Sequence, residues 1–371
     1  MRTSIARLML AMLFLSGLVA CARNEAPQRR SNSRSSVDHL VIKEVFYIGH
    51  AYVQSFPKEY NLSPRPNWYS DEAYITIYNP TSEVKYLDGL ALCSSALDPS
   101  VAVKFQGKED YRKQYLGVST ISYFPGTGKQ HPINPGQTVV IAKYAIDHAK
   151  DFFARLDRDN GSPVDRSLYA GVDDFLDLSK VDWEWTNAEV DGEGKNNPSI
   201  PDLVPIYTGY DKEEKDDVDF GLKEITETSG IALIQLPWTP EDFAKNYPDT
   251  QERRGYRHTV NTLSTHHHNA IKVIEIPFDK AIDCIIVCPK KEYKLNPYST
   301  SDYKDTFDKG FTSVTDNFIK STPTKDWEKY SGLAVIRKWD GKKVVDDNNS
   351  TSDFMVQPAS LRFKKATPSG N

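Results

Sequence analysis

Residues 74–81 (YITIYNPT) carry the clearest structural signal in the chain. The apolar Ile75 and Ile77 alternate with tyrosine and threonine, and a period of two is typical of a strand with one buried face. Pro80 cannot donate a hydrogen bond to a neighbouring strand, so the strand must end before it. A half-buried strand is therefore predicted over residues 73–78.

Further strands are predicted wherever short β-branched or apolar runs lie between turn residues. They cover residues 40–49, 86–94, 138–142, 230–236, 271–278, 283–288 and 333–339. The apolar spacing after the run 138–142 predicts one short helix over residues 143–156. Strands that follow one another without intervening helices favour a mainly β sandwich over a doubly wound fold.

Length and composition bound the class of protein. The chain has 371 residues, enough for a sizeable core, and its 11% aromatic residues exclude wholesale disorder. With 46 Lys and Arg against 51 Asp and Glu, the formal net charge of −5 argues against nucleic acid as a partner.

The first 20 residues are predicted to be a lipoprotein signal peptide. Two arginines precede the short apolar run 8–15, and Leu18-Val19-Ala20-Cys21 follows. This pattern resembles a bacterial lipobox, which implies cleavage before Cys21 and attachment of lipid to its thiol. An ordinary secretory signal with a chance cysteine is the alternative. Residues 21–37 are polar and are predicted to form a tether.

The rest of the chain divides into one domain and a tail. Residues 38–363 are predicted to form the sandwich, with a loop-rich insertion over 157–229, and residues 364–371 a C-terminal tail. Cys284 and Cys288 lie about 13 Å apart along one predicted strand, too far for a mutual disulfide. Cys93 pairs with one of them, or all three are buried free thiols.

The order of several segments resembles lamin-tail-like domains, which are Ig-like β-sandwiches. The segments are residues 41–49 (VIKEVFYIG), 74–81 (YITIYNPT), 86–90 (YLDGL), 135–142 (PGQTVVIA) and 346–354 (DDNNSTSDF). Thr76 departs from the resemblance, because lamin-tail domains usually carry glutamate there. The resemblance implies an Ig-like core and transfers no catalytic residue.

Two more segments are similar to an uncharacterised family of Bacteroidota envelope lipoproteins. They are residues 145–148 (AIDH) and 177–184 (DLSKVDWE). The resemblance implies an outer-membrane lipoprotein. Residues 22–25 (ARNE) lack the run of acidic residues found after the cysteine in surface-exported members, so the periplasmic and the outer face both remain open.

Two kinds of side chain are candidate metal ligands. His266 and His268 would share one face if their segment is extended, and imidazole binds metals well. Carboxylates in acidic loops can hold structural Ca²⁺, which is the one candidate cofactor. These carboxylates are Asp157, Asp159, Asp191 and Glu193. Solvated polar turns are the alternative interpretation of both groups.

Aromatic residues in the insertion could form a stacking platform for a glycan or a peptide. They are Trp183, Trp185, Tyr207 and Tyr210. Packing as the core of the insertion is the alternative.

The sequence favours a non-enzymatic, lipid-anchored binding or accessory protein, with a TonB-dependent outer-membrane receptor as a possible partner. The chain contains no GxSxG, GxxxxGK[ST], GxGxxG or HExxH motif. A metal-dependent hydrolase or metal-handling lipoprotein is the alternative, and a structural lipoprotein is a third reading.

Overall fold

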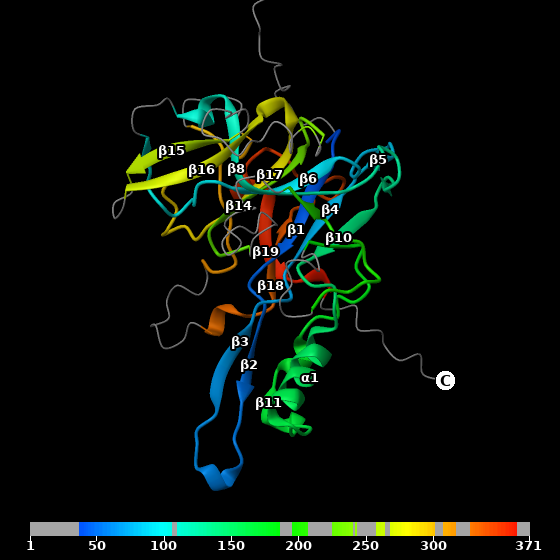
Figure 1. The fold of residues 1–371 in the computed structure, drawn as a ribbon, viewed down its shortest axis with the longest axis vertical. Coiled ribbons are helices and arrows are strands. Elements are labelled where there is room, and N and C mark those ends of the chain that lie inside the picture. Colours follow the sequence, from blue (N-terminus) through cyan, green and yellow to red (C-terminus); the bar gives the residue numbers. More distant parts are fainter. Residues whose placement is uncertain are drawn as a thin grey trace, which may run out of the picture. The chain divides into compact units, whose positions relative to one another are not determined.

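A computed structural model describes residues 37–105, 110–185, 195–206, 225–239, 242, 257–263, 268–300, 307–316 and 327–361, with 257–263 and 268–272 described by their backbone. The described part is mainly β, as the sequence predicted (Figure 1). No helix in it is long and apolar enough to cross a bilayer.

The first sheet is built around β1. Its described strands, in spatial order, are β12 (Trp183–Glu184), β10 (Thr138–Ala142), β4 (Tyr74–Tyr78), β1 (Val41–Phe46), β18 (Leu333–Arg337) and β19 (Phe354–Pro358). Neighbours are antiparallel except β10 and β12, which are parallel. The first described strand is thus joined to the last through β18.

The second sheet packs against the first. Its described strands are β17 (Ala281–Val287), β14 (Ser229–Gln235), β6 (Leu90–Ser95), β8 (Tyr115–Tyr123), β16 (His268–Pro277), β15 (Arg257–Leu263) and β7 (Lys104–Phe105), and β13 (Val204–Pro205) also pairs with β8. Leu92, Leu233 and Ile285 share one core with Ile42 and Ile75 of the first sheet. The two sheets therefore form a sandwich.

Three strands of the second sheet are buried on both faces. In β6, β14 and β17, alternate residues point into the shared core, and the residues between them enter a second core. Cys93, Ala232 and Cys284 are neighbours on that second face. Double burial explains why these strands have nearly continuous apolar sequences instead of an alternating pattern.

The three described cysteines are free and buried. Cys93 and Cys284 both lie opposite Ala232, one on each side of β14. Two strand spacings put their backbones about 9–10 Å apart, beyond the reach of a disulfide. The free-thiol interpretation is the one that fits this register.

The remaining described strands form two small sheets. In one, β2 (His50–Gln54) pairs with β3 (Arg65–Tyr69) and β11 (Tyr169–Ala170); in the other, β5 (Lys85–Tyr86) pairs with β9 (Pro132–Ile133). Short 3₁₀ turns are η1 (Lys58–Tyr60), η2 (Tyr111–Lys113), η3 (Arg166–Leu168), η4 (Val172–Asp174) and η6 (Phe278–Lys280).

The main helix, α1 (His148–Asn160), begins later than predicted. Asp147 caps it by accepting a hydrogen bond from the Lys150 amide at 3.1 Å, and Gly161 ends it in the left-handed conformation. Lys143, the predicted start, instead extends the β10 backbone by donating to the Ala73 carbonyl. Phe152 of α1 packs on Tyr52 of β2, with ring centroids 5.0 Å apart.

The predicted insertion 157–229 is tied to all three larger sheets. It starts within α1 and contributes β11, β12 and β13. Residues 186–194 and 207–224 of this insertion lie outside the described residues.

Gly49 fixes the entry into the β2–β3 hairpin. Its φ is +78°, and a Cβ atom there would lie 1.9 Å from the Tyr69 carbonyl oxygen. Gly136 has the same φ of +78° but has open space around its missing Cβ. A comparison of alanine substitutions at these two positions therefore separates the cost of a positive φ from the cost of a backbone clash.

We predict that Gly136→Ala lowers the free energy of unfolding by about 1 kcal/mol, the cost of a side chain at positive φ. Gly49→Ala should lower it by about 3 kcal/mol or more, because the backbone must also move. Urea unfolding of both variants tests this. Equal losses would show that the close approach does not constrain the fold.

Candidate functional site

A cavity of about 160 Å³ lies where three strands of the first sheet reach one edge. The register aligns Phe46, Tyr74 and Ala142, the end residues of β1, β4 and β10. The residues just beyond these ends must therefore lie side by side. The lining residues are Tyr47, Ile48, Ser70, Ala73, Lys143, Ile225, Thr226, Glu227 and Tyr330.

Lys143 supplies a cationic group to this cavity. Its residue is only 7% exposed, and its ammonium lies 3.0 Å from Asp71 Oδ1. Lys195, also buried, bonds the other oxygen of the same carboxylate. Both ammonium groups lie over the ring of Tyr144, at 5.1 and 4.7 Å from its centroid. A buried ammonium requires such partners because its desolvation is costly.

Another part of the lining carries an ion pair and an aromatic stack. Glu227 forms an ion pair with Lys329, whose ammonium lies 5.4 Å from the Tyr330 ring centroid. The Trp68 ring of β3 stacks on Tyr330, with centroids 5.3 Å apart and planes 12° apart. Burial raises the pKa of Tyr47, whose hydroxyl accepts a hydrogen bond from the Val314 amide.

The cavity therefore combines polar groups with an apolar surface. Hydroxyls of Ser70 and Thr226 and the charged Lys143 and Glu227 surround aliphatic side chains. Polar groups placed beside an apolar surface in one recess are typical of sites for small molecules. Because one water molecule needs about 10–15 Å³ of such volume, this cavity accommodates a molecule of roughly ten heavy atoms.

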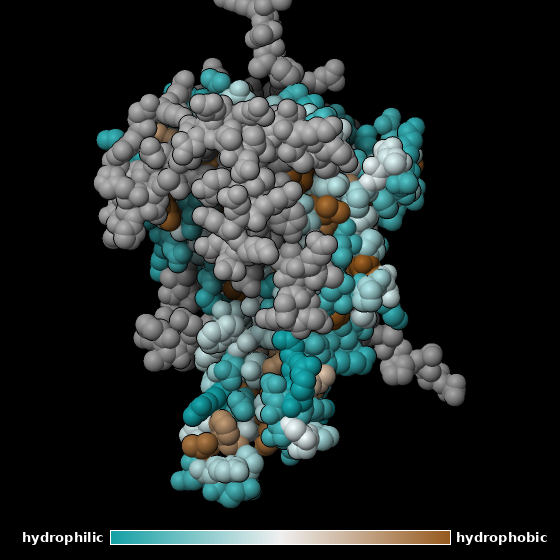
Figure 2. Space-filling view, viewed as in Figure 1, coloured by the Kyte–Doolittle hydropathy of each residue, from teal (hydrophilic) through white to brown (hydrophobic). Residues whose placement is uncertain are grey.

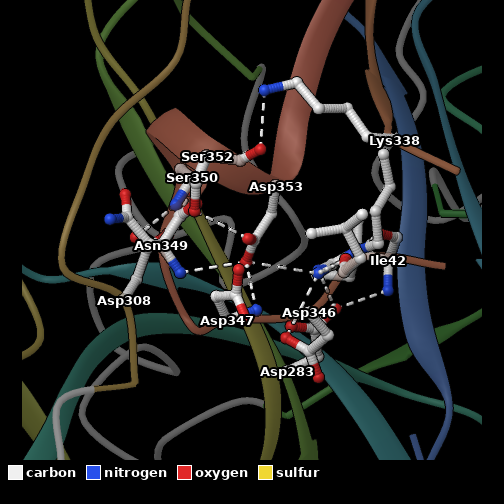
Figure 3. A network of polar contacts seen from close by, with 12 residues as sticks. Ile42, Asp283, Asp308, Lys338, Asp346, Asp347, Asn349, Ser350, Ser352 and Asp353 are labelled. Carbon is white, nitrogen blue, oxygen red and sulfur yellow. Dashed lines mark hydrogen bonds and ion pairs between the residues drawn. The ribbon is translucent and has the colours of Figure 1, made fainter. Parts of the chain in front are cut away.

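A second polar cluster lies inside the sandwich, where residues 346–353 close it (Figure 3). At its centre the Arg337 guanidinium, from β18, is buried and donates to Asp283 Oδ2 at 2.6 Å and to the Ile42 carbonyl at 2.8 Å. It also contacts Asp346 Oδ1 at 3.3 Å and Asp353 Oδ2 at 3.7 Å. One guanidinium thus joins strands β1, β17 and β18 to residues 346–353.

The electrostatics of this cluster are set by burial and by its charges. Burial raises the pKa of Asp283, and the positive charge of Arg337 opposes that effect. Burial would also raise the pKa of Asp346, but His39 and Arg337 hold it well below its usual range. Burial alone would lower the pKa of His39, whereas its contact with Asp346, 3.1 Å away, raises it.

Asp308 occupies a related position against the short helix α3 (Ser350–Asp353). Its Oδ1 accepts hydrogen bonds from the amides of Gly310 and Ser350, each at 2.8 Å, and its Oδ2 contacts the Ser350 hydroxyl. Burial raises its pKa to about 7 despite these hydrogen bonds. Ser350 in turn accepts a hydrogen bond from the Ile286 amide at 3.0 Å, so the contact also reaches β17.

This second cluster is structural in character. Its carboxylates are held by the guanidinium, by backbone amides and by hydroxyls, and Arg337, Asp283 and Asp308 are at most 4% exposed. In the part of the chain that the structure describes, no group of three or more His, Cys, Asp or Glu could hold a metal ion.

Most sequence-predicted site residues lie outside the structural description. Those outside it are Cys21, Asp191, Glu193, Tyr207, Tyr210 and His266. His268 begins β16, where only the backbone is described. The predictions for these residues remain predictions.

The two described acidic candidates, Asp157 and Asp159, lie in the last turns of α1. Asp157 accepts two hydrogen bonds from Arg166, at 2.9 and 2.6 Å, and one from the Val164 amide, so it braces the turn after α1. Asp159 is exposed on the last turn of α1. The calcium prediction for Asp157 and Asp159 stays a prediction: among the described residues, no group of three or more potential metal ligands includes them.

The structure does not support the stacking prediction for Trp183 and Trp185. They are 4% and 2% exposed and belong to the main core, where a ligand cannot reach their faces. Their alternative interpretation, as core of the insertion, fits the structure. Trp183 packs edge-on against Phe124, with centroids 5.2 Å apart.

Sequence reasoning missed Lys143, Arg337, Asp283 and Asp308. Two of them had a local signal, because Asp283 lies inside an apolar strand and Arg337 ends one, and a charge there requires a partner. Lys143 lies at the start of the predicted helix and Asp308 in a segment that resembles an ordinary loop, so only the folded structure brings them to their partners.

These features define a mainly β sandwich protein with a closed polar cluster and one small polar cavity. Residues 134–360 match the family described as "Protein of unknown function (DUF4876)", and the chain belongs to this family. The crystal structure of a DUF4876 family protein from Bacteroides thetaiotaomicron has a similar fold: TM-score 0.56, 19% sequence identity, 90% of this chain and 75% of that chain covered. No curated protein matches.

We predict a pH-dependent contribution to stability from Asp308. Its folded-state pKa of about 7 lies above the ordinary 3.8, so this contribution is fully present below pH 3.8 and is lost as the pH rises through 7. Asp308→Asn stays neutral and keeps the Oδ1 acceptor. Relative to wild type, its free energy of unfolding should increase by about 2 kcal/mol between pH 5 and pH 8.

Urea unfolding at several pH values measures this difference. Asp159→Asn, at an exposed position on α1, is the matched control and should follow the wild-type curve. Parallel curves for Asp308→Asn and wild type would contradict the assignment of the titration to Asp308.

Proposed function

We propose that this protein is a lipid-anchored cell-envelope binding or accessory protein whose ligand site is the cavity beside Lys143. The lipobox-like residues 18–21 support the anchor, and an Ig-like, lamin-tail-like scaffold suits a module that presents a site. The cavity is the observation that carries the binding role. An outer-membrane location with a TonB-dependent receptor as partner is part of the same proposal.

The geometry favours binding because polar groups from separate segments converge on one recess. Lys143 follows β10, Ser70 precedes β4, and Thr226 and Glu227 precede β14. The strand register holds the first two in place, and the contact with Asp71 fixes the Lys143 ammonium. A preorganised set of donors and acceptors reduces the ordering cost of binding.

We predict that Cys21→Ser abolishes lipid attachment. Wild-type protein produced in bacterial cells should incorporate labelled fatty acid and sediment with membranes, and the variant should do neither. Cys93→Ser, at a buried thiol, is the control and should keep its label. Labelling of the Cys21 variant would disprove the anchor without bearing on the cavity.

Crosslinking in intact producing cells, followed by mass spectrometry of the purified protein, tests the accessory role. A stoichiometric outer-membrane receptor would make this chain an accessory subunit. If no other protein is crosslinked to it, the accessory role is contradicted. The binding role of the cavity is then tested with ligands.

We predict that Ser70→Trp closes the cavity to ligands, because Ser70 is exposed and lines it. A thermal-shift panel of monosaccharides, amino acids and dicarboxylates provides the probes. A ligand at 100 times its dissociation constant stabilises the folded state by about 2.7 kcal/mol. That shift should vanish in Ser70→Trp and persist in Ser199→Trp, which changes an exposed serine away from the cavity lining.

A further inference from the structure

Exposed apolar side chains are concentrated on the β2–β3 hairpin. Of the seven large apolar residues exposed in the described part of the chain, three lie on this one hairpin. They are Tyr60, 65% exposed, Leu62, 49%, and Trp68, 52%. Figure 2 shows brown, hydrophobic residues among teal ones in the lower part of the view, where Figure 1 places β2 and β3.

The two faces of the hairpin differ. Tyr52 and Tyr69 point to the face that packs on α1 and η4, where Tyr69 stacks on Phe175 with centroids 4.6 Å apart. Because strand side chains alternate, Val53 and Trp68 point to the opposite face, and the register brings Pro66 beside Val53. Exposed Pro66 and Trp68 on that face, together with Tyr60 and Leu62 at the turn, form what we define as the hairpin patch.

The turn of the hairpin is fully exposed and carries positive charge. All residues from 58 to 66 are exposed, including Lys58 and Arg65. Neither Lys58 nor Arg65 forms an ion pair with another described residue. The Arg65 guanidinium lies 5.3 Å from the Phe56 ring centroid. Glu59 is the one acidic residue between them. Aromatic, aliphatic and cationic side chains on one exposed element match the composition of membrane-surface contacts.

The size of the patch argues against a stable protein interface. At roughly 200 Å² for a full aromatic side chain, its exposed area is about 400 Å², half of the ~800 Å² that each partner buries in a standard complex. A weak contact of this size becomes effective only if something else holds the protein close to the same surface.

The proposed lipid anchor supplies that proximity. Fifteen residues separate Cys21 from Val37, the first described residue, and they cannot span more than about 58 Å. We propose that the hairpin patch is a second membrane contact, in which Tyr60 and Leu62 enter the interfacial region of an anionic bilayer while Lys58 and Arg65 contact headgroup phosphates. In the cell this contact rests on the proposed anchor, because alone it is weak.

Vesicle flotation tests the contact separately from the anchor. The probe is the unlipidated polypeptide 22–371 with vesicles of phosphatidylethanolamine and phosphatidylglycerol at low salt. Wild type should float with these vesicles, and Tyr60→Ser/Leu62→Ser should lower its partition coefficient at least tenfold. Lys58→Gln/Arg65→Gln should lower it to the value for neutral phosphatidylcholine vesicles.

The matched control is Val84→Ser/Val101→Ser, which removes two exposed apolar side chains outside the hairpin and should bind within twofold of wild type. Unchanged thermal unfolding midpoints establish that each variant is folded. Absence of wild-type flotation, or equal flotation of the Tyr60/Leu62 variant, overturns the proposal. A protein crosslink in cells that depends on Tyr60 and Leu62, without vesicle binding, overturns it in favour of a protein groove. None of these outcomes depends on Cys21, so the anchor is judged separately by fatty-acid labelling.

Discussion

The sandwich depends on the contacts that the buried guanidinium of Arg337 makes. Its positive charge faces Asp283, Asp346 and Asp353, and it also donates to the backbone of β1. A buried ion pair adds little net stability over a well-packed apolar contact, yet loss of one partner typically costs about 3–5 kcal/mol because the other charges stay buried. The cluster therefore acts as a register lock, because a slip of β18 by one residue would turn Arg337 to the other face of the sheet.

The predictable part of the fold is the part governed by local pattern. The alternation of Ile75 and Ile77 predicted β4, and the continuous apolar run 138–142 predicted β10 with the bounds that the structure has. The nine-residue β8 was not predicted, because YLGVSTISY mixes serine, threonine and glycine with five aliphatic or aromatic residues at irregular intervals. Its order comes from pairing with β6 and β16, distant segments that a single sequence does not place together.

The candidate sites were harder to predict for the same reason. Histidines and acidic loops attract attention because each is a local cluster, whereas Lys143 and Asp71 are 72 residues apart and meet through the register of β4 and β10. The tryptophans of the insertion illustrate the reverse case. Their residue type was compatible with a ligand-stacking surface and with packing in the core. The parallel pairing of β12 with β10 carries Trp183 into the sandwich and therefore favours packing in the core.

The pairing of the first and last strands through β18 has a consequence for how the chain folds. Ile42 and Arg337 are 295 residues apart, so the centre of the first sheet cannot close until almost the whole chain has been made. Contacts of such sequence separation form slowly because the entropy of closing the loop is lost before the contact is gained. Until then β1, buried at five of its six residues in the native state, has no partner on its β18 side and exposes an aggregation-prone edge. A chain that is exported before it folds would need a chaperone to cover this strand during its passage.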